Sequence, residues 1–310
     1  MVKYRNILVV IDPTKEEQTA LSRAVYICQR EEHAKLKLFL SVYDFSFEMT
    51  TMLSLEEREA MRASVIQQQT AWLEELAAPY RSQGVFIDTK VIWHNRPFES
   101  IIQETLDFGH DLVVKGTHHH PKLQSVIFTP TDWHLLRKCP EPLLLVKNHD
   151  WPENGTILAA IHATAEDDEH VALNDKITRE AQDMAKMINA NVSLINAYPS
   201  TPMNIALELP DFNPIEYSDA VQKRHQDMLA QHAVKHGIAE ERLHVVEGLA
   251  EDVIPQTAKQ VDAELVVLGT VGRTGISAAL IGNTAEHLID SLDCDLLALK
   301  PIDYVSPLQQ

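Results

Sequence analysis

The feature that most constrains this fold is an internal repeat. Residues 111–117 and 264–270 share five of seven identities at an offset of 153, and the same offset relates 143–147 to 296–300. A repeat of this length indicates two copies of one domain. We therefore expect a first domain over residues 1–150 and a second over residues 151–310, joined in a polar stretch near 148–155.

Each half alternates short apolar runs with longer amphipathic segments. In the first half the runs predict strands near 5–11, 36–43, 85–92, 111–115 and 143–147. Continuous apolar runs are typical of parallel strands that are covered on both faces. The pattern predicts an α/β fold, with two tandem doubly wound five-stranded parallel sheets of strand order 3-2-1-4-5. In such a sheet the ligand crevice lies beyond the carboxyl ends of strands one and four.

Two helical faces and a set of histidines complete the pattern. Helical spacing predicts buried stripes that consist of Leu173, Ile177, Ala181, Met184 and Ile188 in the second half, and of Met61, Val65, Trp72, Leu76 and Tyr80 in the first. The histidines His225, His232 and His236 lie singly along another helical segment, and we expect them to face solvent.

The composition excludes several classes of function. Basic residues number 27 and acidic residues 45, so the net charge is -18 and nucleic acid is not an expected partner. The longest apolar runs have five residues, too few for a membrane span or a secretory signal. Three sparse cysteines are typical of buried, reduced thiols. These observations predict a cytoplasmic protein.

The loop after the fourth strand of the second half is rich in glycine. Four of the ten glycines in the chain lie between residues 269 and 284. Glycine lets the backbone approach a ligand closely, and the start of the helix that follows suits a phosphate. A tight turn without a ligand is the alternative. The predicted phosphate-binding residues are Gly269, Thr270, Gly272, Arg273, Gly282, Asn283 and Thr284.

The spacing Gly269-x-x-Gly272, nine residues, Gly282-Asn283 resembles the G-2x-G-9x-G-[ST/N] nucleotide motif of the universal stress proteins. The five-stranded pattern and the place of the loop match that family as well, and the tandem-domain, type E members are the most similar. The resemblance implies a small cytoplasmic stress-response module, of a family whose members are often dimeric through the fifth strand. Some members bind ATP at this motif and others have lost it.

Each half departs from the ATP-binding pattern in a different place. The resemblance implies an Asp at the end of the first strand, beside the nucleoside; Asp12 keeps it, whereas His162 replaces it in the second half. In the first-half loop, His119 and Thr129 replace two glycines and Pro130 removes an N–H donor. We expect a nucleotide-like phosphorylated ligand in the second domain and a degenerate first domain.

A zinc site in the first half is a further hypothesis. His118 and His120 are two residues apart, so in an extended loop both side chains point the same way, near Asp12. Imidazole and carboxylate groups are zinc ligands. A polar loop that merely replaces the phosphate-binding loop is the alternative.

Catalysis has little support, because the sequence contains neither G-x-S-x-G nor H-E-x-x-H. No catalytic residue is predicted, and weak ATP hydrolysis is the most that we expect. A carrier or sensor of an amphiphilic ligand, acylated and phosphate-containing, is the alternative function. It rests on the apolar segments 44–53 and 198–212, beside the predicted crevice.

The partners that we expect are a small-molecule ligand and the chain itself. The matching fifth strands at 143–147 and 296–300 are apolar edges that need cover, so they predict an internal pseudo-dimer. A homodimer of whole chains stays open.

Overall fold

The computed structural model describes residues 4–46, 53–120, 125–127, 129–200, 213–270, 288 and 290–309; for 118–120 and 125–127 it describes the backbone alone. Within these residues the chain forms two compact units. The first unit holds the described residues of 3–119, 127–148 and 305–310, and the second holds those of 120–126 and 149–304.

The first unit is built on a parallel sheet of order β3-β2-β1-β4-β7. This order is the predicted 3-2-1-4-5. The strands are β1 (Asn6–Val10), β2 (Lys35–Val42), β3 (Phe86–Trp93), β4 (Leu112–Gly116) and β7 (Leu143–Val146). The apolar strand residues, such as Leu8, Leu38 and Val113, form the buried core. Two short strands, β5 (His118–His120) and β6 (Ser125–Ile127), follow β4.

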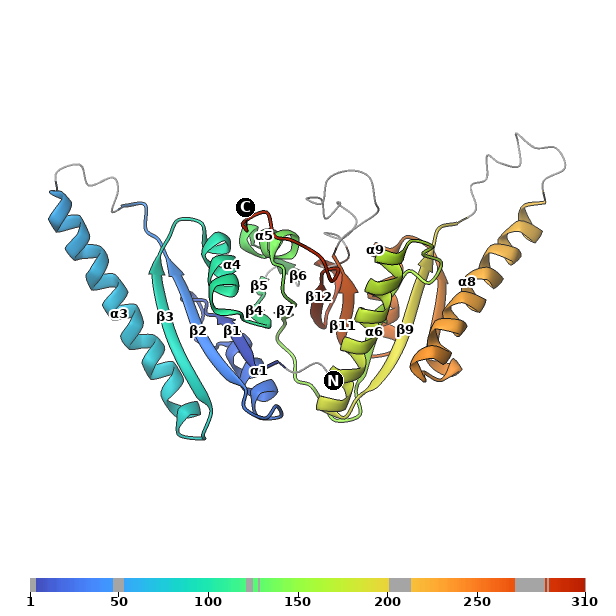
Figure 1. The fold of residues 1–310 in the computed structure, drawn as a ribbon, viewed down its shortest axis with the longest axis horizontal. Coiled ribbons are helices and arrows are strands. Elements are labelled where there is room, and N and C mark those ends of the chain that lie inside the picture. Colours follow the sequence, from blue (N-terminus) through green and yellow to red (C-terminus); the bar gives the residue numbers. More distant parts are fainter. Residues whose placement is uncertain are drawn as a thin grey trace. The chain divides into compact units, whose positions relative to one another are not determined.

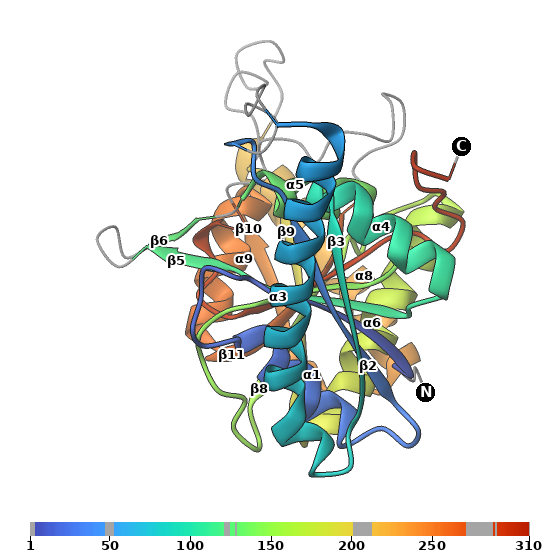
Figure 2. The same ribbon diagram turned by 90° about the vertical axis from the view of Figure 1, so that its left-hand side faces the viewer.

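In the described residues, four helices accompany this sheet: α1 (Thr19–Cys28), α3 (Leu55–Arg81), α4 (Pro97–Phe108) and α5 (Pro130–Lys138). Figure 1 shows α3 and α4 on opposite sides of β3, and in Figure 2 α3 lies in front of the sheet. On α3 the fully buried residues are Leu73 and Ala77, whereas Met61 is exposed. The predicted stripe is therefore wrong in phase, because its five residues are intermediate or exposed and the buried residues each come one position after a predicted one.

The second unit repeats the arrangement, with the parallel order β10-β9-β8-β11-β12. Its strands are β8 (Thr156–Ala160), β9 (Asn191–Tyr198), β10 (Leu243–Glu247), β11 (Ala263–Gly269) and β12 (Asp295–Leu299). Its helical segments are α6 (Asp168–Ile188), α8 (Pro214–His236), the short 3-10 helix η1 (Glu240–Arg242) and α9 (Ala250–Gln260).

Helix α6 is held at both ends and buried along one face. Asp167 caps its first turn by accepting a hydrogen bond from the backbone N–H of His170, and Asn189 ends it in the left-handed conformation at φ 54°. The stripe predicted for this helix is confirmed, because all five of its residues are buried. Helix α8 lies beside α6, since Nε2 of Gln182 donates to the carbonyl of His236 at 2.7 Å.

Three further observations concern the cysteines, the helices and the end of the chain. Cys28, Cys139 and Cys294 are buried and are not joined in disulfides, as expected. Among the described helices, none is long and apolar enough to cross a bilayer. The last residues of the chain belong to the first unit, where Oγ of Ser306 donates to the carbonyl of Lys138 at 2.7 Å.

Candidate functional site

The predicted site residues of the second unit that the structure describes lie at one edge of its sheet. Strands β8 and β11 are parallel neighbours, so their carboxyl ends share an edge. His162 follows β8, Gly269 ends β11 and Thr270 comes next. The other predicted phosphate-binding residues, Gly272, Arg273, Gly282, Asn283 and Thr284, lie outside the described part of the chain.

Two asparagines hold the backbone after β8. Asn174 of α6 accepts a hydrogen bond from the N–H of His162 at 3.0 Å and donates to its carbonyl at 2.8 Å. Oδ1 of Asn196, a fully buried residue of β9, accepts from the N–H of Ala163 at 2.8 Å. The loop is thus fixed by side chains from two elements, while His162 itself is exposed. Nε2 of His162 is 3.3 Å from Oγ1 of Thr164, and its ring lies edge-on to that of His170, so the exposed imidazole is itself oriented by neighbours at the strand end.

A second histidine lies behind this loop. Nδ1 of His225 accepts a hydrogen bond from Nδ2 of Asn196 at 2.8 Å, and its ring stacks on Tyr198 with centroids 4.9 Å apart. Burial lowers the pKa of His225, and the neighbouring His162 and Arg224 lower it further. The ring is therefore neutral at pH 7, and Asn196 connects it to the strand-end backbone.

The end of β11 has a local packing reason for its glycine. A Cβ on Gly269 would lie 2.7 Å from Cδ2 of Leu173 on α6. Thr270 is buried, and its N–H donates to the carbonyl of Leu299 at 3.0 Å. Nζ of Lys300 donates to the Thr270 hydroxyl at 2.7 Å. Gly269 thus lets α6 pack closely, whatever its role toward a ligand.

The corresponding edge of the first unit shares the backbone clamp. Gln18 accepts a hydrogen bond from the N–H of Asp12 at 3.1 Å and donates to its carbonyl at 2.7 Å. Oδ1 of Asp12 accepts bonds from the N–H and the hydroxyl of Thr14 at 2.9 and 2.6 Å. Asp12 therefore lies at the strand end, as predicted, with one oxygen turned to its own loop.

A lysine after β1 reaches the end of the neighbouring strand β4 in the first unit. Nζ of Lys15 donates to the carbonyl of Thr117, directly after β4, at 2.5 Å. Burial lowers the pKa of Lys15, and this effect is opposed by Asp12 and reinforced by Lys115. Sequence reasoning missed Lys15, because a lysine after a strand has no distinctive spacing.

A buried ion pair lies where the resemblance places a phosphate-binding helix start. Nζ of Lys115, at the end of β4, is 2.6 Å from Oδ1 of Asp132, and the two side chains are 9% and 0% exposed. Oδ2 of Asp132 accepts hydrogen bonds from the N–H and the hydroxyl of Thr129. The Thr129 hydroxyl oxygen in turn accepts a hydrogen bond from the backbone N–H of Asp132. A carboxylate of the protein itself thus satisfies the positive end of α5.

The second half lacks this pair at the matching positions. At the offset of 153 residues, Lys115 corresponds to Leu268 and Asp132 to Ala285. The sequence feature that indicates this pair is a lysine within an apolar strand, at a position where the repeat has leucine.

The zinc prediction stays a prediction. His118 and His120 both belong to β5, so their alternate positions put them on one face of a strand, as expected. Their side chains lie outside the described part of the structure.

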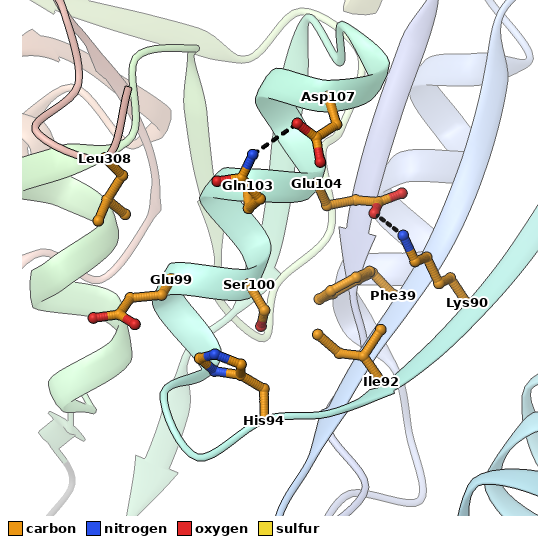
Figure 3. A pocket seen from close by; sticks show the side chains of 10 residues that line it. All are labelled: Phe39, Lys90, Ile92, His94, Glu99, Ser100, Gln103, Glu104, Asp107 and Leu308. Atoms are coloured by element: carbon orange, nitrogen blue, oxygen red, sulfur yellow. Dashed lines mark hydrogen bonds and ion pairs between the residues drawn. The ribbon is translucent and has the colours of Figure 1, made fainter. Parts of the chain in front are cut away.

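Figure 3 shows a pocket of the first unit that contains none of the predicted site residues. It has a volume of about 350 Å³ and lies between β2, β3 and α4, with Leu308 at one side. Its buried carboxylate, Glu104, is bound by Lys37 at 2.9 Å and Lys90 at 2.5 Å. The lining holds three carboxylates, Glu99, Glu104 and Asp107, and one lysine, Lys90, so the pocket does not favour an anionic ligand.

The prediction that His225, His232 and His236 face solvent was wrong. The side chains of His232 and His236 are only 13% and 6% exposed, and His225 is packed against Tyr198. The reason is that α8 lies against α6 and β9, which single-helix spacing does not reveal. Burial lowers the pKa of His232 to about 4, an effect that His236 reinforces and Asp175 opposes.

Comparison with known proteins agrees with this architecture. Residues 3–147 and 168–300 each match the model of the Universal stress protein family. The chain is 54% identical to Universal stress protein E of Escherichia coli K12, over 100% of this chain and 98% of that protein. It is 42% identical to a Universal stress protein E homolog of Haemophilus influenzae, over 97% of this chain and 98% of that one.

Two solved structures resemble the whole chain. A functionally unknown protein from Pseudomonas aeruginosa PAO1 is 33% identical, with a TM-score of 0.75 over 97% of this chain and 94% of that one. A universal stress protein from Archaeoglobus fulgidus is 13% identical, with a TM-score of 0.64 over 97% and 98% of the two chains, which shows a shared fold.

Proposed function

We propose a function for this chain from its family. The chain belongs to the universal stress protein family. The proposal is that it is a stress-response module whose second domain binds a nucleotide-like phosphorylated ligand. The proposal places the ligand at the strand ends of the second unit, with its phosphates on the loop from Gly269 to Thr284 and its remainder beside His162. ATP is the first ligand to test, and the cytoplasm is the compartment that the family resemblance favours.

The contrast between the two halves is the observation that carries this proposal. In the first unit the Asp132 carboxylate caps α5 and pairs with Lys115, so an added phosphate would meet a negative charge. In the second half Leu268 and Ala285 stand at those positions and the glycines of the motif are kept. The second half therefore lacks both charges of the internal pair and retains glycine where a backbone must approach an anion.

The test is titration calorimetry of ATP into the full chain. Gly272→Val places a β-branched side chain on the loop without removing core volume, and we expect it to abolish binding while the fold is kept. His119→Gly is the matched control in the first half, and it should change little because Thr129 and Pro130 remain. Absence of nucleotide binding by the wild type at millimolar concentration would contradict the proposal. Phosphate release measured on the same samples tests weak ATP hydrolysis.

The amphiphilic ligand is the alternative occupant of the same loop. Its apolar part would lie under residues 201–212, which are outside the described part of the chain. Replacing Ile205 and Leu207 with Ser should weaken an acylated nucleotide-sugar and leave ATP unchanged. Equal effects on both ligands would refute this alternative.

Assembly through the fifth strands also belongs to the proposal. β7 and β12 each lie at one end of their own unit's strand order, and both are apolar. An apolar edge strand needs a partner, so we expect residues 1–150 expressed alone to dimerise or aggregate. A stable, monodisperse monomer in analytical ultracentrifugation would count against it, and the same measurement on the full chain tests for a homodimer.

A further inference from the structure

A cluster of three metal-binding side chains lies in the second unit, where α8 packs on α6. His232 and His236 are four residues apart on α8, so both lie on one face of that helix. Asp175 of α6 faces them, and one ligand atom from each of the three residues lies within 4.8 Å of the other two. The side chains are 16%, 13% and 6% exposed for Asp175, His232 and His236. The cluster is therefore largely shielded, and it is carried by two regular helices.

The orientation of the His232 ring is fixed by Thr178. The Thr178 hydroxyl donates its proton to the carbonyl of Asn174 at 2.9 Å, so its oxygen accepts from Nε2–H of His232 at 2.8 Å. Nδ1 of His232 lies 4.0 Å from Oδ1 of Asp175, too far for a hydrogen bond. Nδ1 thus offers its lone pair to the space beside the carboxylate, and the bond at the other ring nitrogen is the outer-shell contact typical of metal-binding histidines.

His236 completes the set. Its Nε2 lies 2.9 Å from the same Oδ1 of Asp175. A small outward movement of either group separates these atoms to the distance that two ligands keep around a tetrahedral ion with bonds of about 2.0–2.2 Å. Binding requires a neutral His236 ring with its proton on Nδ1, so that Nε2 provides the lone pair.

Lys235 is the competitor for this carboxylate. Its Nζ is 2.5 Å from Oδ2 of Asp175, and its side chain is 55% exposed. An exposed lysine loses little by turning into water, whereas its charge repels a cation while it stays. The ammonium therefore lowers the affinity of the cluster for a metal without blocking it.

We propose that Asp175, His232 and His236 bind a divalent transition-metal ion of the zinc type, which links α6 to α8. Two imidazoles and one carboxylate suit Zn²⁺, whereas Ca²⁺ and Mg²⁺ prefer oxygen ligands alone. Three protein ligands leave the fourth position to water or to a group from outside. The proposal is independent of the nucleotide site and of the His118–His120 prediction, because it uses none of their residues.

The test measures Zn²⁺ affinity of the full chain, stripped of metal, by competition with a chromophoric chelator. A His118→Ala/His120→Ala variant serves as the background, so that any zinc on the first unit is removed. We expect one zinc ion per chain in this background. His236→Gln and Asp175→Asn should each weaken binding by about 100-fold or more, and Thr178→Val by on the order of 10-fold, as for an outer-shell partner. His244→Gln removes a histidine outside the cluster and is the matched control.

Two further measurements separate metal binding from a structural role. Co²⁺ should give the visible absorption of a tetrahedral site, and His232→Gln should abolish it. Lys235→Met should strengthen zinc binding by about 10-fold, because it removes the competing charge. If the cluster had only a structural role, this change would not raise the affinity for zinc. Circular dichroism without metal checks that each variant is folded. Zinc affinity that is equal in wild type, Asp175→Asn and His236→Gln, or that falls in Lys235→Met, would overturn the proposal.

Discussion

Oδ1 of Asp132 lies 2.6 Å from Nζ of Lys115, and the same carboxylate caps helix α5 through Thr129. One side chain thus provides the negative charge that both a buried lysine and a helix start require. The matching positions of the second half, Leu268 and Ala285, need no such charge. At these aligned positions the first half therefore carries both charges of the pair, and the second half carries neither.

Removal of Asp132 alone should be strongly destabilising. Asp132→Ala leaves Lys115 buried without its partner and α5 without its cap, and we expect a loss of about 3–5 kcal/mol in the free energy of unfolding. Lys115→Leu combined with Asp132→Ala reproduces the second-half residues and should cost far less than the sum of the single changes. Urea unfolding of the four proteins in this double-mutant cycle measures the difference, and additive effects would contradict the internal-anion interpretation.

Gly269→Ala should destabilise the second unit by about 1–3 kcal/mol, because the new Cβ would lie 2.7 Å from Cδ2 of Leu173 in a packed core. Gly116→Ala is the matched change at the corresponding strand end, where the nearest atom is Oγ1 of Thr19 at 3.3 Å, and it should cost less. Adding Leu173→Ala to Gly269→Ala should relieve the crowding, so that the pair costs less than the sum. Thermal unfolding of Gly269→Ala, Leu173→Ala, the pair of these changes and Gly116→Ala measures these effects. A Gly269→Ala protein as stable as the wild type would show that α6 adjusts freely.

The repeat made most of the fold predictable. Parallel strands covered on both faces are continuous apolar runs, so their number, their order and the strand-end position of Asp12 and His162 followed from the sequence. The interactions between one element and another could not be predicted in this way. The phase of α3 and the burial of His232 and His236 depend on which neighbouring element each helix packs against. The Lys115–Asp132 pair joins residues 17 positions apart, and nothing in their local sequence shows that both side chains turn inward.

The buried carboxylate of Glu104 should make the first unit sensitive to acid. Burial by itself raises its pKa, but His110, Lys90 and Lys37 outweigh this effect and hold the pKa at about 2, below the ordinary 4.5. The folded state thus favours the ionised form. Its contribution to stability is complete above pH 4.5 and is lost as the pH falls from 4.5 toward 2. Glu104→Gln should cost about 2–3 kcal/mol at pH 7 and much less at pH 3.

The measurement for Glu104 is urea unfolding at pH 7, 4 and 3, followed by tryptophan fluorescence. Of the four tryptophans, Trp72, Trp93 and Trp133 lie in the first unit and Trp151 in the second, so the signal reports mainly the unit that contains Glu104. Glu99→Gln, a change at a more exposed carboxylate of the same helix, is the control. A difference between wild type and Glu104→Gln that stays constant with pH would contradict the assignment.

The last six residues of the chain should stabilise the first unit, although they follow the second in sequence. Ser306 is fully buried, and its hydroxyl donates to the carbonyl at the end of α5, that of Lys138. Leu308 lines the pocket beside α4 (Figure 3). A chain that ends at Tyr304 loses this hydrogen bond and this apolar cover, and we expect the first unit to lose about 1–3 kcal/mol.

Tryptophan fluorescence during urea unfolding again reports the first unit. Ser306→Ala, which removes the hydroxyl and keeps the segment, should lower the unfolding free energy of the first unit by about 1 kcal/mol. Val305→Ala is the control, because that side chain is 63% exposed and its truncation should have little effect. A shortened chain whose first unit unfolds at the same urea concentration as the full chain would show that residues 305–310 do not contribute to its stability. A chain that stops after Tyr304 would then be as suitable for expression as one that includes residues 305–310.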